Sequence, residues 1–324
     1  MSVTIFRRAL AASALAGCCA LAGCSAAPAA APAAASYPAP VPRSSAPASR
    51  AAAIPVSVTR TNPQSPKPVL PRVSIIRVRT ADGALVTVAT FLGPVLYVLH
   101  DGSADPGPVA GLRAGPAVTG AERMRLLAAF NGGFKLSAGV GGYVQEGHVI
   151  SPLRRGLASL VIDRSGRARI GVWGSGVPAP GEAIYSVRQN LPPLVLDARP
   201  TAASADWGLW GATLGGGAYV ARSAIGQNAA GDLMFAASMS ALPADLAAVL
   251  ASHGARIAME LDINPEWVQL DVARRPGGPL TAEVPGQDRP ADQYLVGWTR
   301  DFFAVVASPS GPAAAPPRLE HLRP

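Results

Sequence analysis

The composition of the first 71 residues is unsuited to a folded core, so the part of this chain that can fold is about 240 residues long. From Ser25 to about Pro71 the sequence consists mostly of Ala, Pro and Ser, and it lacks the apolar periodicity of a helix or a strand. Such a segment buries too little apolar surface to offset the entropy lost on ordering. We therefore predict a disordered linker at 24–71, one folded domain at 72–308 and a loose tail at 309–324.

Residues 1–23 have the features of a signal peptide. Two adjacent arginines precede an apolar stretch, 9–23, that is too short to span a membrane. Residues 21–24, Leu-Ala-Gly-Cys, resemble a bacterial lipobox, which predicts export and lipidation of Cys24. The protein would then be a lipoprotein on the outer face of the cytoplasmic membrane or elsewhere in the cell envelope. The alternative is an ordinary signal peptide with an incidental cysteine.

Cysteine usage and charge exclude several classes of site in the predicted domain. All three cysteines, Cys18, Cys19 and Cys24, lie in or directly after the leader, so disulfides, zinc thiolates and cysteine nucleophiles are not expected beyond it. The net charge of +8 also comes from the amino-terminal part, because 1–81 holds nine Lys and Arg and no Asp or Glu. The remaining 19 basic and 20 acidic residues nearly cancel, which disfavours a nucleic-acid-binding face.

Alternating apolar residues between turn signals indicate a strand-rich domain. The predicted strands are 73–80, 84–91, 95–99, 157–162, 168–173, 219–225, 233–236 and 302–306. One helix is predicted at 243–253, where apolar residues follow a helical period and Gly254 ends the element. We predict an α+β fold in which helices flank a mixed, largely antiparallel sheet.

Two carboxylates lie two residues apart in a further predicted strand, 256–263. Alternate residues of a strand share a face, so Glu260 and Asp262 would project from one face, about 7 Å apart. The opposite face would be apolar and buried, with Met259, Leu261 and Ile263. Two carboxylates this close can perturb each other and act as acid and base, whereas the alternative is a strand with a solvated face.

A third carboxylate and an aromatic ring follow this strand. Pro265 lacks the amide hydrogen that a central strand needs, so the chain is expected to turn there. Glu266 and Trp267 then lie on a loop, where the indole could stack against a sugar. If a metal binds, the oxygen-rich segment around Asp262 favours Ca²⁺ or Mg²⁺.

Asn131-Gly132-Gly133-Phe134 follows an apolar stretch. Two glycines permit a close backbone approach, and the asparagine amide both donates and accepts hydrogen bonds. The segment could therefore hold a polar ligand against main-chain amides. The alternative is a simple hairpin turn, because Asn-Gly is a common hairpin signal.

Arg222 lies in the middle of the predicted strand 219–225. Its guanidinium could pair with a carboxylate or bind a phosphate through two parallel hydrogen bonds. Ser223 would face the other side of a regular strand, so both residues could serve one site only if the strand contained a bulge.

Segments 131–134, 221–226 and 258–267 together resemble the phosphodiester glycosidase family, over roughly 72–308. The resemblance implies hydrolysis of the bond between the anomeric carbon of a sugar and a phosphodiester. The family usually has Leu-Asp-Gly-Gly-Gly-Ser where residues 261–266 here read Leu-Asp-Ile-Asn-Pro-Glu. The catalytic candidates are Asp262, Glu260 and Glu266, and the substrate-binding candidates are Asn131, Gly132, Gly133, Phe134, Arg222, Ser223, Asn264 and Trp267.

The resemblance predicts an envelope-anchored hydrolase of a sugar phosphodiester, or of a related glycosidic bond, in cell-wall polymer or exopolysaccharide. Its expected partners are a glycan or sugar-phosphate polymer and, through the lipid, the membrane, with no nucleic acid. One alternative is a catalytically inactive carbohydrate-binding lipoprotein of the same fold, with Trp210 and Trp267 as sugar platforms. Another is an envelope scaffold protein without a ligand.

Overall fold

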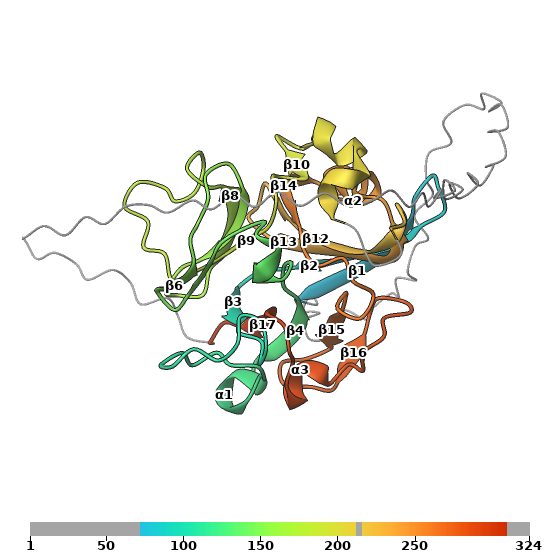
Figure 1. The fold of residues 1–324 in the computed structure, drawn as a ribbon. Coiled ribbons are helices and arrows are strands. Elements are labelled where there is room, and N and C mark those ends of the chain that lie inside the picture. Colours follow the sequence, from blue (N-terminus) through green and yellow to red (C-terminus); the bar gives the residue numbers. More distant parts are fainter. Residues whose placement is uncertain (1–71, 212–215, 310–324) are drawn as a thin grey trace, which may run out of the picture. The chain divides into compact units, whose positions relative to one another are not determined.

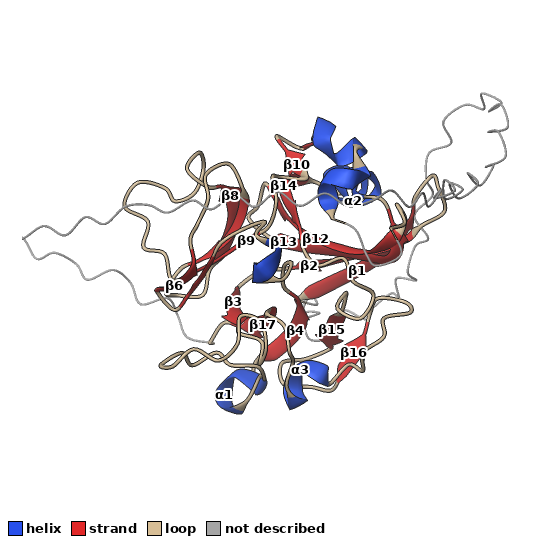
Figure 2. Ribbon diagram, in the orientation of Figure 1, coloured by secondary structure: helices blue, strands red, loops and turns tan. Residues whose placement is uncertain are grey.

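Strands account for most of the regular structure of this domain (Figure 1, Figure 2). The computed structural model describes residues 72–211 and 216–309. The seven-stranded sheet has the order β1-β2-β13-β12-β14-β10-β11. These strands are β1 (Val73–Arg79), β2 (Leu85–Phe91), β10 (Val195–Leu196), β11 (Arg199–Pro200), β12 (Val220–Asn228), β13 (Leu233–Ala241) and β14 (Ala255–Glu260).

Two five-stranded sheets complete the fold, with the orders β16-β15-β4-β17-β3 and β6-β5-β9-β7-β8. The first contains β3 (Val95–His100), β4 (Leu126–Asn131), β15 (Leu270–Ala273), β16 (Leu280–Ala282) and β17 (Phe302–Ala307). The second contains β5 (Tyr143–Gln145), β6 (His148–Ser151), β7 (Ala158–Ile162), β8 (Ala168–Val172) and β9 (Ser186–Gln189).

Helices are few and short. They are α1 (Gly120–Arg123), α2 (Pro243–Ser252), α3 (Gln293–Val296) and the 3₁₀ turns η1 (Leu136–Ala138), η2 (Ala202–Ala205) and η3 (Trp207–Trp210). None of the helices in the described part of the chain is long and apolar enough to cross a membrane.

The predicted α+β class is therefore wrong in part, because the domain is largely β. Every ladder between the named strands is antiparallel, so the sheets are not mixed. Among the described residues only α2 reaches ten residues, whereas α1 and α3 have four each. The apolar faces of the sheets are covered mainly by one another, which leaves little apolar surface for helices to bury.

One central core joins all three sheets. The ring of Phe130 on β4 lies at its centre, 5.6 Å from the ring of Phe91 on β2, 5.0 Å from that of Phe235 on β13 and 5.3 Å from that of Phe303 on β17. Aromatic pairs at such distances stabilise a core beyond the area they bury. This core fixes how the seven-stranded sheet packs on the sheet that contains β4 and its last residue, Asn131.

The other face of the seven-stranded sheet packs against α2, whose Leu246, Val249 and Leu250 join a second core. This helix confirms the predicted apolar stripe. It begins with Pro243, and the Asp245 carboxylate accepts a hydrogen bond from the Leu242 amide at 2.9 Å. Figure 1 shows α2 near β10 and β14.

The carboxylate-bearing strand is shorter than predicted. Met259 and Leu261 lie in the central core, as the alternation predicts, but β14 ends at Glu260. The Asp262 amide leaves the ladder and donates to the Gly132 carbonyl at 3.0 Å. Ile263 is buried apart from the central core, next to Phe134. Its predicted burial is therefore confirmed, but it lies beyond the end of β14 and does not continue the face of the strand.

The hairpin reading of the Asn-Gly segment is also wrong. Asn131 is the last residue of β4, which pairs with β15 and β17 rather than with the strand that follows it. Neither Gly132 nor Gly133 has a positive φ, so the segment is not a two-residue hairpin turn. The glycines are needed for close packing instead, because a Cβ at either position would lie within 3 Å of the Asp301 or Arg188 side chain.

Candidate active site

Strand ends from all three sheets bring six charged side chains together. We call Asp101, Asp105, Arg188, Asp262, Arg300 and Asp301 the junction network. Asp101 follows β3, Arg188 lies in β9, Asp262 follows β14, and Arg300 and Asp301 precede β17. All are buried except Asp105, whose side chain is 20% exposed. Such a concentration of buried charge requires close pairing.

Asp301 and Arg188 form the inner pair of this network. The Arg188 Nε donates to Asp301 Oδ2 at 2.7 Å, and its Nη2 donates to Oδ1 at 3.3 Å. The Gly133 amide also donates to Oδ2, at 3.3 Å. A Cβ at Gly132 would collide with the Asp301 carboxylate, and a Cβ at Gly133 would lie 2.9 Å from the guanidinium carbon of Arg188. The Gly-Gly pair therefore allows the backbone to touch these charges.

Arg300 connects the backbone of Gly133 to two further carboxylates, those of Asp262 and Asp105. Its Nη2 donates to Asp262 Oδ2 at 3.0 Å and to the Gly133 carbonyl at 2.9 Å. Its Nη1 lies 3.0 Å from Asp105 Oδ2. The other oxygen of Asp262, Oδ1, accepts from the Ile263 amide at 2.8 Å. The carboxyl group of Asp262 is thus held in one orientation from both sides.

Burial raises the pKa of Asp262 to about 7, although the Arg300 guanidinium and the Ile263 amide lower it and the Asp301 charge raises it further. Burial also raises the pKa of Asp101 to about 6, against the hydrogen bond from Tyr143. At pH 6 the Asp262 carboxyl is therefore mostly protonated, whereas an ordinary aspartate is ionised. A carboxyl with a pKa near 7 is suited to general acid catalysis at neutral pH.

Asn131 and Ser223 fix the backbone beside Asp262. The Asn131 amide donates to Ser223 Oγ at 2.8 Å and to the Gly132 carbonyl at 3.0 Å, and its oxygen accepts from the Gln269 amide. Ser223 Oγ in turn donates to the Asp262 carbonyl at 2.8 Å. Asn131 is 1% exposed. These contacts use its hydrogen-bonding groups within the protein, so it positions Asp262 rather than facing a sugar.

Arg222 and Glu260 form a separate buried ion pair. Arg222 Nη1 donates to Glu260 Oε1 at 2.7 Å and to the Trp210 carbonyl, and Nε donates to the Ala241 carbonyl. Both side chains are fully buried. Burial raises the pKa of Glu260 to about 8, in opposition to Arg222. Of the two readings of Arg222, the structure favours the pair with a carboxylate over the phosphate contact.

Arg222 and Ser223 do not act together, although β12 has an irregularity close to them. The pairing of β12 with β13 shifts between Val220 and Arg222, as at a bulge. Ser223 nevertheless bonds toward Asp262, while Arg222 bonds toward Glu260. The two residues serve opposite faces, as a regular strand requires.

The loop after Asp262 contributes the accessible part of the site. Trp267 is half-buried, with the Arg300 guanidinium 4.5 Å and the exposed Lys135 ammonium 4.9 Å from the ring centroid. Glu266 is exposed and lies 3.2 Å from an Arg289 nitrogen. The Asn264 side chain accepts from the Glu266 amide at 2.9 Å and shapes the turn. Any sugar stacking on Trp267 would have to displace Lys135.

Trp210 does not form a sugar platform. Its side chain is 1% exposed and packs in the core under α2, and its indole nitrogen donates to the Ala203 carbonyl at 2.7 Å. The prediction that Trp210 stacks on a sugar is wrong, because the sequence around it does not reveal that η3 turns the ring inward.

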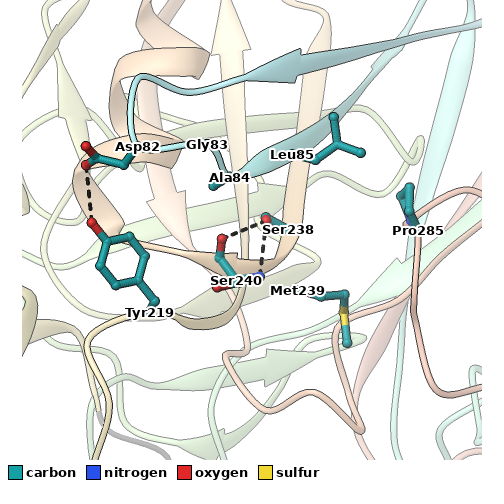
Figure 3. Close-up of a pocket in the computed structure, with 9 residues that line it drawn as sticks. All are labelled: Asp82, Gly83, Ala84, Leu85, Tyr219, Ser238, Met239, Ser240 and Pro285. Atoms are coloured by element: carbon teal, nitrogen blue, oxygen red, sulfur yellow. Dashed lines mark hydrogen bonds between the residues drawn. The ribbon is translucent and has the colours of Figure 1, made fainter.

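A pocket of about 330 Å³ lies at the β1–β2 turn (Figure 3). Tyr219 donates to Asp82 Oδ2 across its mouth at 3.2 Å, and Ser238 and Ser240 bond to each other in its wall. The pocket shares no residue with the junction network. No group of three or more His, Cys, Asp or Glu side chains among residues 72–211 and 216–309 is arranged to hold a metal ion.

Sequence patterns alone do not identify Arg188, Arg300, Asp301 and Asp101 as site residues. Asp101, Arg300 and Asp301 lie beside the apolar strands β3 and β17, where a charge is itself a signal of a buried pair, whereas Arg188 lies in the mostly polar strand β9. The signal does not identify the partner, since Arg188 and Asp301 are 113 positions apart. Their pairing depends on how the sheets pack.

Comparison with solved structures finds distant likenesses. The zebrafish N-acetylglucosamine-1-phosphodiester alpha-N-acetylglucosaminidase catalytic domain, auto-inhibited by its pro-peptide, is 12% identical, with a TM-score of 0.46 over 76% of this chain and 85% of that chain. A hypothetical protein from Synechocystis is 15% identical, with a TM-score of 0.45 over 73% of this chain and 62% of that chain. No curated protein matches the chain.

A family model matches part of the chain, and the match includes Arg188 and Asp262 of the junction network but not its other four residues. Residues 124–262 match the model of the phosphodiester glycosidase family. The matched range begins just before β4 and ends at Asp262, and it includes Asn131, Arg188 and Arg222. This part of the chain, which is less than half of it, is similar to the phosphodiester glycosidase (NAGPA) family.

Proposed function

We propose that the domain hydrolyses the bond between the anomeric carbon of a sugar and a phosphodiester, with Asp262 as the general acid. The observation that carries this proposal is the buried carboxyl of Asp262, whose pKa is raised to about 7, at the end of the family-matched segment. In the reaction the anomeric C–O bond breaks, water supplies the new hydroxyl on the sugar, and the phosphate leaves as a monoester. Asp262 donates its proton to the departing phosphate oxygen, the attacking water releases its other proton to solvent, and Asp262 is reprotonated from solvent.

Arg300 and the Ile263 amide orient this acid. Arg300 contacts only one oxygen of Asp262, and the amide contacts the other. After proton transfer both contacts stabilise the new carboxylate, because each donates a hydrogen bond to it. The same arrangement therefore supports the acid before the reaction and its anion afterwards.

In this reaction Lys135, rather than Arg222, would bind the phosphate. Its ammonium is exposed and lies over Trp267, which also contacts Arg300. A phosphodiester carries one negative charge, so one mobile cation complements it. The indole would then support the sugar or the group attached to the phosphate. Glu260 has the role of holding Arg222 and the end of β14, since its carboxylate is enclosed.

The substrate is proposed to be an envelope polymer, and the anchor to be a lipid on Cys24. Residues 21–24 carry the lipobox pattern, and they lie outside the described residues. A lipid there would keep the domain close to cell-wall polymer or exopolysaccharide.

Asp262→Asn is expected to lower kcat on an N-acetylglucosamine-1-phosphodiester by a factor of about 100 or more, because the amide keeps the shape but has no acidic proton. In the wild-type protein kcat should fall as the pH rises through about 7, where Asp262 loses its proton. Steady-state kinetics between pH 5 and pH 9 (roughly two units on either side) measure both effects.

The matched control is Asp288→Asn, an exposed aspartate outside the network, which should keep the wild-type rate and pH profile. Turnover of Asp262→Asn at the control rate would refute the assigned acid. Saturable sugar binding by the wild-type protein, with no turnover on any phosphodiester, would favour the inactive carbohydrate-binding alternative.

Lys135→Ala should raise KM for the phosphodiester by about tenfold, since one charge contact with the phosphate is lost, and should leave thermal stability unchanged.

Arg222→Lys should instead lower the free energy of unfolding by about 1–3 kcal/mol, because lysine cannot replace the buried hydrogen bonds to Glu260, Trp210 and Ala241. Kinetics and chemical denaturation of both variants provide the comparison, with Lys135→Arg as the charge-retaining control. The reverse pattern would make Arg222 the phosphate ligand.

Cys24→Ala should move the protein from the membrane fraction to the soluble exported fraction, or block processing of the leader, because the acceptor of the lipid is absent. Fractionation and mass spectrometry of the mature amino terminus measure this. A membrane-bound wild-type protein with an unmodified Cys24 would contradict lipidation.

A further inference from the structure

A groove of about 560 Å³ lies between the edge strand β1 and the β15–β16 edge of the neighbouring sheet. Its apolar wall includes Ile75, Leu127 and Val272. Three arginines, Arg72, Arg274 and Arg275, also line it, with Glu283 as the one carboxylate. The groove therefore combines an apolar wall with an excess of positive charge.

The arginines of this groove differ in how far they are already engaged. The Glu283 carboxylate lies 3.0 Å from Arg77 Nη2, and Arg72 donates to the Pro94 carbonyl at 2.9 Å. Arg274 and Arg275 are exposed, and neither takes part in an ion pair within the described residues. Two adjacent guanidinium groups are thus available to an anionic ligand, and the guanidinium matches phosphate through paired hydrogen bonds.

The groove and the Asp262 site lie at opposite ends of the same strands. Leu127, near the start of β4, lines the groove, while Asn131 ends β4 beside Asp262. Four residues of strand separate them, or about 13 Å. Similarly, Trp267 precedes β15 at the site, and Arg274 follows β15 at the groove. A chain of a few sugar-phosphate units is long enough to contact both.

We propose that this groove binds an anionic stretch of the polymeric substrate, namely phosphodiester-linked glycan, away from the bond that is cleaved. The inference rests on the proposed function and specifies its substrate as a polymer. The groove has no aromatic side chain in its lining, and single-stranded nucleic acids are held largely by stacking of bases on aromatic rings. A glycan with phosphate charges and no bases fits the lining better.

Contacts at such a remote position affect the polymer and a short substrate differently. A small sugar-1-phosphodiester reaches only the Asp262 site, so its KM should not depend on Arg274 or Arg275. The polymer reaches both places, so its affinity should depend on them and should fall with salt as ions compete for the phosphate charges.

The experiment measures binding without turnover, in the full-length protein carrying Asp262→Asn. The probe is poly(N-acetylglucosamine 1-phosphate), titrated by calorimetry at several salt concentrations. Adding Arg274→Ala and Arg275→Ala together should raise Kd by at least about tenfold and should reduce the slope of log Kd against log salt by about 1.4. In the wild-type background the same pair should leave KM and kcat for the short diester unchanged.

Arg199→Ala with Arg256→Ala is the matched control. Both arginines are exposed, lie on the seven-stranded sheet outside the groove, and remove the same charge. Their loss should leave Kd unchanged. Thr281→Arg, at an exposed position in the groove lining, should tighten binding.

Three outcomes would overturn the inference. They are equal losses in the groove and control variants, no tightening in Thr281→Arg, or a fold-change in KM for the short diester equal to the fold-change in Kd for the polymer. Polygalacturonate and oligo(dT) are the comparison probes, and tighter binding of either would replace the phosphodiester glycan by a carboxylated glycan or a nucleic acid. Because binding is measured without turnover, it stands or fails separately from the role of Asp262.

Discussion

The site depends on a charge imbalance that the fold buries. Four carboxylates of the junction network meet only two guanidinium groups, those of Arg188 and Arg300. Excess negative charge in a poorly hydrated interior is costly, and the protein relieves it by raising the pKa of selected carboxyl groups. Asp301 is paired with Arg188 through two hydrogen bonds, whereas Asp262 has one guanidinium contact and carries the raised pKa. Burial is the main cause of the raised pKa of Asp262, and the nearby Asp301 charge adds to it, so that a neutral acid lies just beyond the end of β14.

The backbone makes this concentration of charge possible. At Gly132 a side chain would collide with Asp301, and at Gly133 it would collide with Arg188. The Gly132 carbonyl accepts a hydrogen bond from the Asp262 amide, and the Gly133 carbonyl accepts one from Arg300. Asn131 and Ser223 hold the neighbouring strands in register at the same point. Substituting either glycine would therefore disturb the charged pairs before it disturbed the hydrophobic core, which Phe130 anchors on the same strand.

Local patterns in the sequence predict much of the fold and part of the site. The strand alternation correctly predicts the buried positions of Met259 and Leu261, because that period is a property of a single strand. The sequence did not show that β14 ends at Glu260, since this end is set by a hydrogen bond to Gly132, far away in the chain. For the same reason Glu260 and Asp262 appeared equivalent, although one is enclosed with Arg222 and the other joins the junction network.

The proposed chemistry requires that Asp262 holds a proton near neutral pH. Carbon-13 NMR of the aspartate side-chain carboxyl groups, titrated from pH 3 to pH 9 (roughly the range spanning ordinary and raised carboxyl values), measures it directly, and the resonance lost in Asp262→Asn gives the assignment. The account predicts a midpoint at a pKa of about 7 for this resonance. A midpoint at or below the ordinary aspartate pKa of about 4 would contradict it, because Asp262 would then be ionised at neutral pH and have no proton to donate.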